Sequence, residues 1–441
     1  MSDIPRRTAS RTAKLASLPL GAAGRAAAGW GRRMAGGDRE EISAQMMAKS
    51  AEQLFAVLGE LKGGAMKFGQ ALSVFEAAVP DEMAEPFREA LVKLQTAAPP
   101  MPGADVHRML AEQFGRGWRT RFREFDETPA AAASIGQVHR AVWRDGREVA
   151  VKVQYPGAEA ALVSDLRQLS RMSRLLAPLA PGMEIKPLIA ELQDRMVEEL
   201  DYRDEAANQR AFAAVFDGDP EIKVPAVVAS APKAMVSEWV TGRKLSDVIR
   251  SGTTEERDHA GARLAAFHYS APYRAHLLHA DPHPGNFQIL GDGRLLVVDY
   301  GAVARLPEGL PGPLVQMTKF ALENRPEDLM ELMRNEGFVR AGTEITAAEA
   351  LGYLAPFTEP LHTERFRFTR AWLQAQAGRV GDLRSPEFDT GRALNLPPQY
   401  LLVHRVTLGT LGVLCQLEAD VPLRGIVGHW QPELFEADAA T

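Results

Sequence analysis

The spacing of apolar positions divides the chain into a helical first part, a β-rich middle and a long helical second half. Residues 40–79 carry apolar side chains at near-helical intervals until Pro80 ends the pattern. A second helical stretch covers 81–95, and a short helix is expected over 105–114. From about residue 245 the pattern is mostly helical again. The prolines that interrupt its last part are Pro356, Pro360, Pro386, Pro397 and Pro398.

Strand signals lie between these helical parts. One hairpin is expected over 135–153 around Asp145-Gly146, a two-residue turn signal. Two further short strands are expected at 224–228 and 234–240, and a second hairpin covers 287–298 with its turn at 291–293. The middle of the chain therefore predicts a small β-rich lobe, and the second hairpin lies inside the helical lobe.

A long helix is expected from about Glu184 to Phe216. Its apolar stripe consists of Leu188, Leu192, Met196 and Leu200. The same helix carries five acidic residues within 198–205, which is ordinarily a solvated face. A buried lysine nearby would give at least one of these acids a function, but the residues alone do not select which one.

Composition indicates a folded protein in a reducing compartment. Of 441 residues, 46% are hydrophobic and 24% are charged, which excludes a mainly disordered or collagen-like chain. The single cysteine, Cys415, excludes an intramolecular disulfide and a cysteine-rich metal site. The longest uncharged apolar stretch, 406–417, is shorter than the roughly 20 residues of a transmembrane helix, so no span is predicted.

Charge is distributed unevenly. Residues 1–37 contain seven Lys and Arg against one acid, which leaves an acidic body of 44 basic and 56 acidic residues. An acidic body argues against broad nucleic-acid binding. The basic segment is consistent with an anionic membrane surface, an organelle transit peptide or a solvated disordered tail.

The strand 148–153 carries the first candidate chemistry. With period-two alternation, its three valines face one way, whereas Ala150 and Lys152 face the other. A small residue beside a lysine would leave room for adenine and place a cation near phosphates. A solvent-reaching strand lysine is the commoner explanation of the same pattern.

The second hairpin is flanked by oxygen ligands. Asp281 and Asn286 have the D-x-x-x-x-N spacing of a kinase catalytic loop, and Asp299 follows the hairpin as a metal-binding aspartate would. Carboxylate and amide oxygens suit Mg²⁺. The alternative is a purely structural role, in which these residues form an Asx turn network that stabilises the loop.

A rival interpretation treats His279, Asp281 and His283 as ligands of a zinc hydrolase. No further His or Glu cluster completes that set, and it leaves Lys152 and Asp299 without a role. We therefore expect His283 to pack within the loop.

Two small-residue segments complete the candidate features. Where a protein kinase has a glycine-rich loop, residues 129–137 contain Ala131, Ala132, Ala133 and Ser134 instead. Because alanine does not adopt positive φ cheaply, the backbone would approach a nucleotide differently. The leader segment 61–70 contains glycines within a helical pattern, which indicates close helix packing or close approach to another group.

With these residues assembled, the chain resembles the UbiB/AarF family of atypical protein-kinase-like proteins. The matching features are Lys67-x-Gly69-Gln70 in the leader, the alanine-rich loop at 131–134, Glu199-x-Asp201 and the kinase-like set. The kinase-like set consists of Lys152, Glu205, Asp281, Asn286 and Asp299. The matches run in order from about residue 58 to 302. One departure is Tyr300, which replaces the Phe of the D-F-G element, a mild exchange.

The resemblance implies a role for each matching residue. Lys152 would pair with Glu205, Asn286 and Asp299 would hold Mg²⁺, and Asp281 would take the catalytic-loop position. The alanine-rich segment with Ser134 would cover the nucleotide, beside Ala150. Backbone groups of the segment 237–240, including Glu238 and Val240, would meet the adenine. Lys67 and Gln70 would sit in a regulatory position near Glu199 and Asp201.

The resemblance also implies an α+β, bilobal kinase-like fold whose helical leader packs over the nucleotide cleft. The expected divisions are a basic segment 1–39, a leader 40–124, an N-lobe 125–240 and a helical C-lobe 241–441. The implied activity is that of an Mg-dependent ATPase or small-molecule kinase supporting isoprenoid-quinone biosynthesis or lipid homeostasis, and not that of a general protein kinase. A non-catalytic nucleotide-gated scaffold and an antibiotic-type phosphotransferase are the alternatives.

The expected partners are ATP or ADP, an anionic membrane surface, and quinone-biosynthesis enzymes or a lipid or phenolic small molecule. No nucleic acid is expected. The expected location is the cytoplasm, with peripheral association at the inner face of the membrane.

Overall fold

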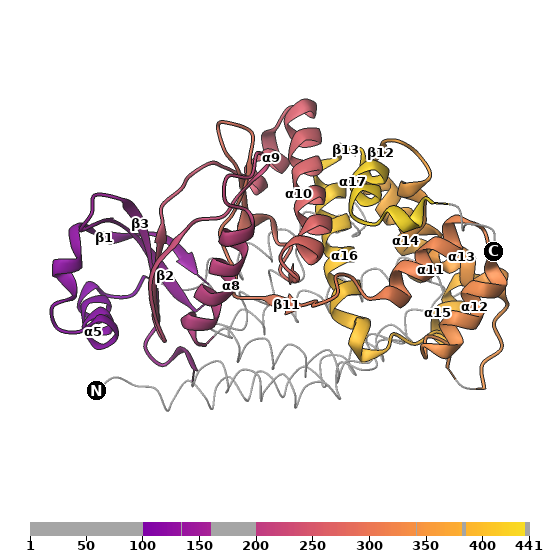
Figure 1. The fold of residues 1–441 in the computed structure, drawn as a ribbon, viewed down its shortest axis with the longest axis horizontal. Coiled ribbons are helices and arrows are strands. Elements are labelled where there is room, and N and C mark those ends of the chain that lie inside the picture. The colour runs from indigo at the N-terminus through magenta and orange to yellow at the C-terminus, as the bar shows by residue number, and fades with distance from the viewer. Residues whose placement is uncertain (1–99, 134, 160–199, 341, 382–384, 437–441) are drawn as a thin grey trace, which may run out of the picture.

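The computed structural model describes residues 100–133, 135–159, 200–340, 342–381 and 385–436. Its first lobe is a five-stranded antiparallel sheet in the order β1-β2-β3-β6-β5 (Figure 1). The strands are β1 Phe122–Ala133, β2 Gly136–Trp143, β3 Glu148–Gln154, β5 Val227–Ala231 and β6 Ala234–Glu238. The predicted hairpin around Asp145-Gly146 is confirmed, and Gly146 has φ +96°, which favours glycine.

One face of this sheet is covered by α5 (Gly103–Phe114), which confirms the short helix predicted there. Val149, Val151 and Val153 are fully buried, as period-two alternation predicts, and they pack with Val106 and Leu110 of α5. The short helix η2 (Trp118–Arg121) adds Trp118 to the same core. Because α5 shares the sheet's hydrophobic core, it is structurally part of this lobe.

The long helix predicted over 184–216 is not continuous. Leu200 and Asp201 are non-helical, and α8 spans Tyr202–Val215. The Asp201 side chain accepts a hydrogen bond from the Arg203 amide at 2.9 Å and so caps a new helix. The apolar stripe runs up to Leu200, directly before this cap, so periodicity alone did not reveal the cap. Residues 184–199, the helical segments 40–79 and 81–95, and the segment 61–70 lie outside the described residues.

The strand predicted at 224–228 is shifted. The chain instead forms β4 (Ile222–Lys223) and β5, with Pro225 between them. Proline lacks the amide hydrogen that a strand ladder needs, which explains the interruption. The strand predicted at 234–240 exists as β6 but ends at Glu238.

The second lobe begins with α9 (Leu245–Ser251) and α10 (Thr254–Arg274), which starts with a complete Thr253–Glu256 capping box. The predicted second hairpin is confirmed as β9 (Phe287–Ile289) and β10 (Leu295–Val297). It joins β4 and β7 (Arg243–Lys244) in a four-stranded sheet. Nearby, β8 (Leu277–His279) pairs with β11 (Val303–Arg305). These two small sheets position the loops on either side of the second hairpin.

The rest of the described chain is mainly helical, as expected. It contains α11 Gly312–Leu322, α12 Pro326–Asn335, α13 Ala347–Thr358, η5 Glu359–Leu361, β12 Phe366–Arg367, α14 Arg370–Gly381, α15 Pro386–Ala393, α16 Pro398–Leu417, β13 Asp420–Val421, α17 Leu423–Trp430 and η6 Pro432–Leu434. Pro386 and Pro398 occupy first helical positions, where a missing amide hydrogen has little cost. These prolines therefore begin helices, whereas Pro356 lies within α13.

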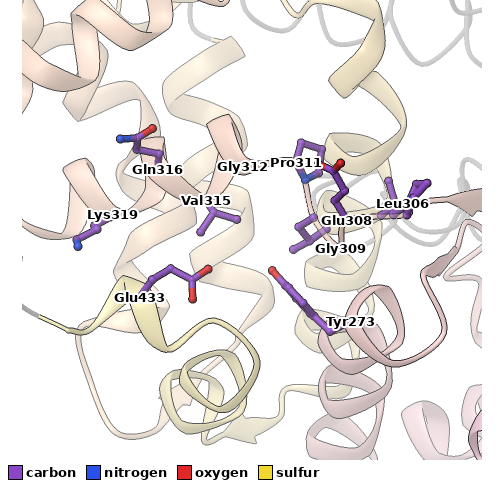
Figure 2. A pocket seen from close by; sticks show the side chains of 12 residues that line it. Tyr273, Leu306, Glu308, Gly309, Pro311, Gly312, Val315, Gln316, Lys319 and Glu433 are labelled. Atoms are coloured by element: carbon purple, nitrogen blue, oxygen red, sulfur yellow. The ribbon is translucent and has the colours of Figure 1, made fainter.

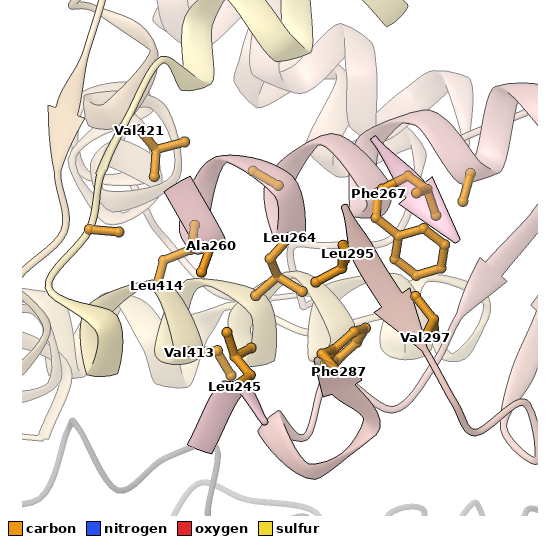
Figure 3. Packing of buried hydrophobic residues seen from close by; sticks show 14 of the residues in the cluster. Leu245, Ala260, Leu264, Phe267, Phe287, Leu295, Val297, Val413, Leu414 and Val421 are labelled. Atoms are coloured by element: carbon orange, nitrogen blue, oxygen red, sulfur yellow. The ribbon is translucent and has the colours of Figure 1, made fainter. Parts of the chain in front are cut away.

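The core of the second lobe gathers around α10. Leu264 and Phe267 pack with Phe287 and Leu295 of the hairpin and with Leu414 of α16 (Figure 3). The helix α16 is 20 residues long and, by length and composition, is the one described helix that could cross a membrane. It is longer than the stretch considered in the sequence because it includes Arg405. Its apolar window is 67% buried inside the protein, so this is weak evidence for a span.

Candidate functional site

Lys152 lies at the junction of the two lobes, where it meets two carboxylates. It stands on the central strand β3, on the face opposite the valines, and its Nζ lies 2.7 and 2.8 Å from the two Glu205 carboxylate oxygens. Asp299 Oδ2 lies 3.5 Å from the same Nζ. Glu205 projects from the first turn of α8, a position set by the Asp201 cap. The structure thus selects Glu205 from the acidic segment that the residues alone left open.

The electrostatics of this group favour a permanently charged lysine. The side chains of Lys152 and Glu205 are only 16% and 5% exposed. Burial lowers the pKa of the Lys152 ammonium, but the Asp299 and Glu205 carboxylates outweigh this effect and hold that pKa well above its usual value. A fixed cation between two acids is suited to holding polyphosphate oxygens.

The second hairpin brings Asn286 and Asp299 to one place. Val298 donates its amide hydrogen to the Asn286 carbonyl at 3.0 Å, so the backbones at the two ends of the hairpin are joined. The Asn286 amide nitrogen donates to the Asp281 carbonyl at 3.1 Å, which leaves the amide oxygen as its ligating atom. Asp299 Oδ1 accepts from the Gly301 amide at 2.9 Å. The oxygen donors of Asn286 and Asp299 fit a hard divalent cation such as Mg²⁺.

The histidines of this loop have structural partners. His279 Nε2 lies 2.5 Å from the Asp299 carbonyl oxygen, and the His283 ring nitrogen Nδ1 accepts from the Gly285 amide at 3.0 Å. Within the described part of the chain, no group of three or more His, Cys, Asp or Glu side chains could hold a metal ion. The zinc-hydrolase interpretation therefore has no support here, and His283 packs within the loop as expected.

The place expected for adenine is the strand edge where β6 ends. Ala150 is paired with Ser237 across β3 and β6, and the Trp239 amide donates to the Glu148 carbonyl at 2.9 Å. The Glu238 carboxylate is held by Lys223 Nζ at 2.9 Å and so is turned away from this edge. Val240 follows the strand, and its amide has no backbone partner among the described residues. Contact of the Val240 backbone with an adenine base stays a prediction.

The alanine-rich segment is a strand and not a loop. Ala131, Ala132 and Ala133 extend β1 and pair with Val138, Gln137 and Gly136 of β2. Strand pairing uses only backbone groups, so a run of alanines supports it as well as larger residues do. The hairpin tip follows at Ser134, which lies outside the described residues. This alanine-rich hairpin, residues 131–137, approaches the end of β3 that carries Lys152.

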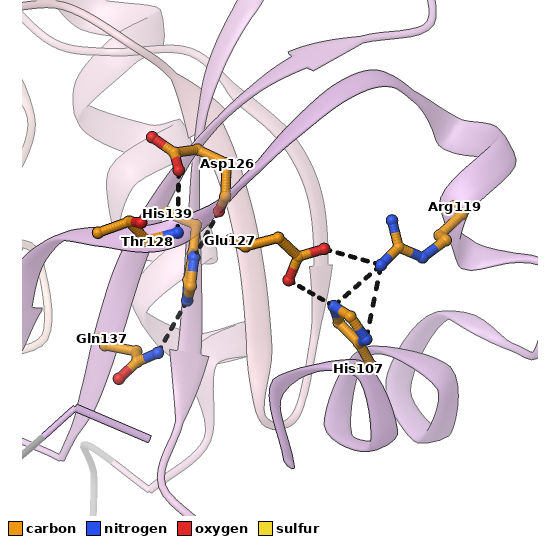
Figure 4. A network of polar contacts seen from close by, with 7 residues as sticks. All are labelled: His107, Arg119, Asp126, Glu127, Thr128, Gln137 and His139. Carbon is orange, nitrogen blue, oxygen red and sulfur yellow. Dashed lines mark hydrogen bonds and ion pairs between the residues drawn. The ribbon is translucent and has the colours of Figure 1, made fainter. Parts of the chain in front are cut away.

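A chain of hydrogen bonds inside the first lobe holds this hairpin (Figure 4). The Met101 amide donates to Gln137 Oε1 at 2.7 Å, and Gln137 Nε2 lies 2.8 Å from His139 Nε2. His139 Nδ1 lies 2.8 Å from the Asp126 carbonyl oxygen. Burial lowers the pKa of His139, which keeps the ring neutral and able to accept from Gln137. The chain ties the start of α5 to both strands of the hairpin.

The expected regulatory residues are only partly described. Lys67, Gln70 and Glu199 lie outside the described residues. Asp201 caps α8 and pairs with Arg203 at 2.5 Å. The hydrogen bonds to Arg203 lower the pKa of the Asp201 carboxyl, so this carboxyl is charged and holds the Arg203 guanidinium. The proximity of Lys67 to Asp201 stays a prediction.

Sequence reasoning missed Tyr202 and the Gln137–His139 pair. Tyr202 follows the capping aspartate and is 1% exposed, with Lys152 Nζ 5.1 Å from its ring centroid. The sequence feature that could have identified Tyr202 is its position directly after the Glu199-x-Asp201 motif. Gln137 and His139 alternate on one face of a strand otherwise read as apolar, so no pattern distinguished them.

A separate cavity lies in the second lobe, away from Lys152. It has a volume of about 710 Å³ and is lined by the end of α10, the β11–α11 loop, α11 and Glu433 (Figure 2). The Tyr273 hydroxyl and the Glu433 carboxylate point toward one another across it, as Figure 2 shows. Burial, followed by the Glu433 charge, raises the pKa of Tyr273 to about 12. None of the kinase-like residues lines this cavity.

Comparison with known proteins agrees with this arrangement. Residues 93–333 match the family described as the ABC1 atypical kinase-like domain. A solved structure described as the complex of Rv3197 with erythromycin from Mycobacterium tuberculosis is 47% identical, with a TM-score of 0.69. That comparison covers 91% of this chain and 100% of the other.

Two curated relatives extend the comparison. The protein slr1919 from Synechocystis is 34% identical over 319 residues, covering 67% of this chain and 53% of its own length. The mitochondrial atypical kinase coq-8 from Caenorhabditis elegans is 29% identical over 362 residues, covering 79% of this chain and 47% of its own length. The chain spans about half the length of these two relatives. With the family match over more than half its length, the chain belongs to the UbiB family of ABC1 atypical kinase-like proteins.

Proposed function

We propose that this protein is an Mg-dependent, ATP-binding atypical kinase or ATPase of the UbiB type. The observation that carries the proposal is the position of Lys152, which lies between Glu205 at 2.7 Å and Asp299 at 3.5 Å. Asn286 is joined to Asp299 through the backbone of the second hairpin. A lysine–glutamate pair facing two oxygen ligands is the arrangement that protein kinases use for phosphoryl transfer.

Each residue has a role that its surroundings support. Lys152, oriented by Glu205, would hold the phosphates, and the Val240 backbone would hold the adenine over Ala150. The alanine-rich hairpin with Ser134 would cover the phosphates. Asn286 and Asp299 would hold Mg²⁺, which supplies charge neutralisation for the phosphates when bound. Asp281 would accept the proton of the attacking hydroxyl or water.

The biological setting is proposed from the family. Relatives are named atypical kinases of mitochondria, and one from Arabidopsis is named a chloroplastic kinase of ACTIVITY OF BC1 COMPLEX type. We propose a role in isoprenoid-quinone biosynthesis or lipid homeostasis, with a lipid or phenolic small molecule as acceptor. The seven basic residues within 1–37 support peripheral contact with anionic lipid.

The test compares two Asp→Asn substitutions, one directly after the second hairpin and one at its turn. Asp299→Asn removes the proposed ligand, whereas Asp292→Asn changes an exposed turn residue that bonds to Arg294. Phosphate release from Mg-ATP and nucleotide binding are measured for both, with and without anionic vesicles. We expect only Asp299→Asn to abolish turnover and weaken Mg-ATP binding. Equal binding by Asp299→Asn and wild type would remove that residue from the site.

The alternative of a nucleotide-gated scaffold predicts a different result in the same experiment. A scaffold would bind Mg-ATP tightly without releasing phosphate, in the presence or absence of vesicles. Turnover that depends on Asp299 would exclude it. An absence of any Mg-ATP binding by wild type would overturn both proposals.

A second candidate function is macrolide binding. It is favoured by the 47% identity to the Mycobacterium tuberculosis protein whose structure is described as an erythromycin complex. Titration of this protein with erythromycin by calorimetry would test it. Saturable binding would support the candidate, and the absence of heat at millimolar ligand at two well-separated temperatures would overturn it.

A further inference from the structure

The ring of Tyr202 lies against the Lys152 ammonium. Tyr202 is the first helical residue of α8 and is 1% exposed. Its amide donates to the Pro232 carbonyl at 2.9 Å, which anchors the start of the helix to the β5–β6 turn. None of the roles proposed for the site uses this side chain.

The Tyr202 ring faces the charge of Lys152. The Nζ atom lies 5.1 Å from the ring centroid, within the range of a cation–π contact. Glu205 lies three residues further along α8, on the same side of the helix. One helical turn therefore supplies both an aromatic face and a carboxylate to the same ammonium group.

The other contact of Tyr202 is the alanine-rich hairpin. A Cβ atom at Gly136 would lie 2.9 Å from Tyr202 Oη and 2.3 Å from the Val153 carbonyl oxygen. Ile135, at the hairpin tip, packs with Tyr202, Ala206 and Met235 in one small core. The hairpin thus rests on the tyrosine, and only glycine at 136 permits this approach.

A purely structural tyrosine would explain the burial but not this placement. An apolar residue could fill a pocket formed by Ile135, Ala206 and Met235. Tyr202 instead places its ring against the buried Lys152 ammonium and its hydroxyl close to the backbone of Gly136, which has no side chain. We propose that Tyr202 is a positioning residue, which holds the Lys152 ammonium in place and sets how closely the alanine-rich hairpin approaches it. The consequence for nucleotide binding rests on the proposed function, but the positioning itself does not.

The test begins without nucleotide. Lys152 is labelled with an amine-reactive reagent across a pH series, and hydrogen exchange is followed over 130–137. Tyr202→Leu is expected to raise the Lys152 labelling rate roughly tenfold and to speed exchange in the hairpin. Tyr202→Phe keeps the aromatic face and should restore slow labelling. Tyr353→Leu is the matched control, because Tyr353 lies in α13 of the second lobe, away from the first-lobe sheet.

The outcomes separate this inference from the proposed function. Unchanged labelling and exchange in Tyr202→Leu would overturn the inference even if wild type hydrolyses ATP. A wild type that binds no Mg-ATP would overturn the proposed function, while labelling would still decide the role of Tyr202. If wild type turns over ATP, Tyr202→Leu should raise KM more than it lowers kcat. If Tyr202→Leu does not fold, Tyr202→Met replaces it, and equal labelling of Tyr202→Met and Tyr202→Phe would also refute the aromatic contact.

Discussion

The Lys152–Glu205 pair should be strongly coupled, and a double-mutant cycle measures this directly. The pair is 16% and 5% exposed and makes two short contacts of 2.7 and 2.8 Å. Breaking a buried ion pair typically costs about 3–5 kcal/mol, because one charge is left buried without its partner. Asp299 lies 3.5 Å from Lys152 and partly compensates when Glu205 is lost. We therefore expect Glu205→Leu to cost about 3 kcal/mol and Lys152→Met at least as much.

Replacing both residues should cost less than either change alone. Removal of both partners leaves no buried unpaired charge in the pair, and such replacements are often nearly neutral in free energy. We expect the Lys152→Met/Glu205→Leu variant to lose about 1–2 kcal/mol, which gives a coupling of roughly 4 kcal/mol or more. These losses lie within the usual 5–15 kcal/mol stability of a domain, so the variants should remain folded.

Urea unfolding followed by tryptophan fluorescence is the assay, with equal m-values required across the cycle. Arg140→Met and Glu148→Leu form the control cycle, since this pair lies on the same sheet with side chains 52% and 51% exposed. Its coupling should be at most about 1 kcal/mol. A Lys152–Glu205 coupling no larger than that of the control would refute the reasoning that burial makes the pair strong.

Three further changes test other parts of the structure. Gly136→Ala should destabilise the hairpin and weaken Mg-ATP binding, because the new Cβ would lie 2.3 Å from a backbone oxygen. The control is Gly352→Ala in α13, where a Cβ meets no atom within 4 Å. This control should raise the free energy of unfolding by about 0.5–1 kcal/mol in the same urea assay. Gln137→Leu leaves the Met101 amide without its acceptor and His139 without its donor, so unfolding midpoints should fall by an equivalent of about 2–3 kcal/mol; a loss below about 0.5 kcal/mol would contradict the hydrogen-bond chain. Burial lowers the pKa of His268 to about 4, so the unfolded chain binds its proton first as pH falls from 6.5 to 4, and unfolding free energy should drop by up to about 3 kcal/mol in that window. His268→Leu should flatten that part of the stability–pH curve, and an unchanged slope would show that His268 is not the group responsible.

The local features of the site were predictable from the sequence because they depend on short spacings. The strand alternation around Lys152 and the two hairpin turns each use a pattern of a few residues, and both hairpins are confirmed. The D-x-x-x-x-N spacing likewise places Asp281 and Asn286 in one loop, where the Asn286 amide bonds to the Asp281 carbonyl. These relationships do not require knowledge of long-range packing.

The remaining features depend on competition between signals. The strand expected at 224–228 instead begins at Val227, because Pro225 cannot donate an amide hydrogen to a strand ladder. The choice of Glu205 from five acids required the three-dimensional position of β3 relative to α8. The buried Gln137–His139 pair is polar on an apolar face, and only its complete hydrogen bonding explains why it is tolerated there.

The break in the predicted helix at Leu200–Asp201 determines where the site residues of α8 lie. The apolar stripe predicted one continuous helix over 184–216, and such a helix would have no N-terminus at residue 201. The Asp201 side chain instead bonds to the Arg203 amide and begins α8 there. Tyr202 and Glu205 consequently fall in the first turn, where one side of the helix meets Lys152. If this reasoning holds, Asp201 acts on the site through the position of the helix start, in addition to any contact with Lys67. Asp201→Asn and Asp201→Ser would preserve the cap and should preserve the Lys152 geometry, whereas Asp201→Ala should loosen the helix start and the Lys152 contacts. Slow Lys152 labelling in all three variants would contradict this role of Asp201.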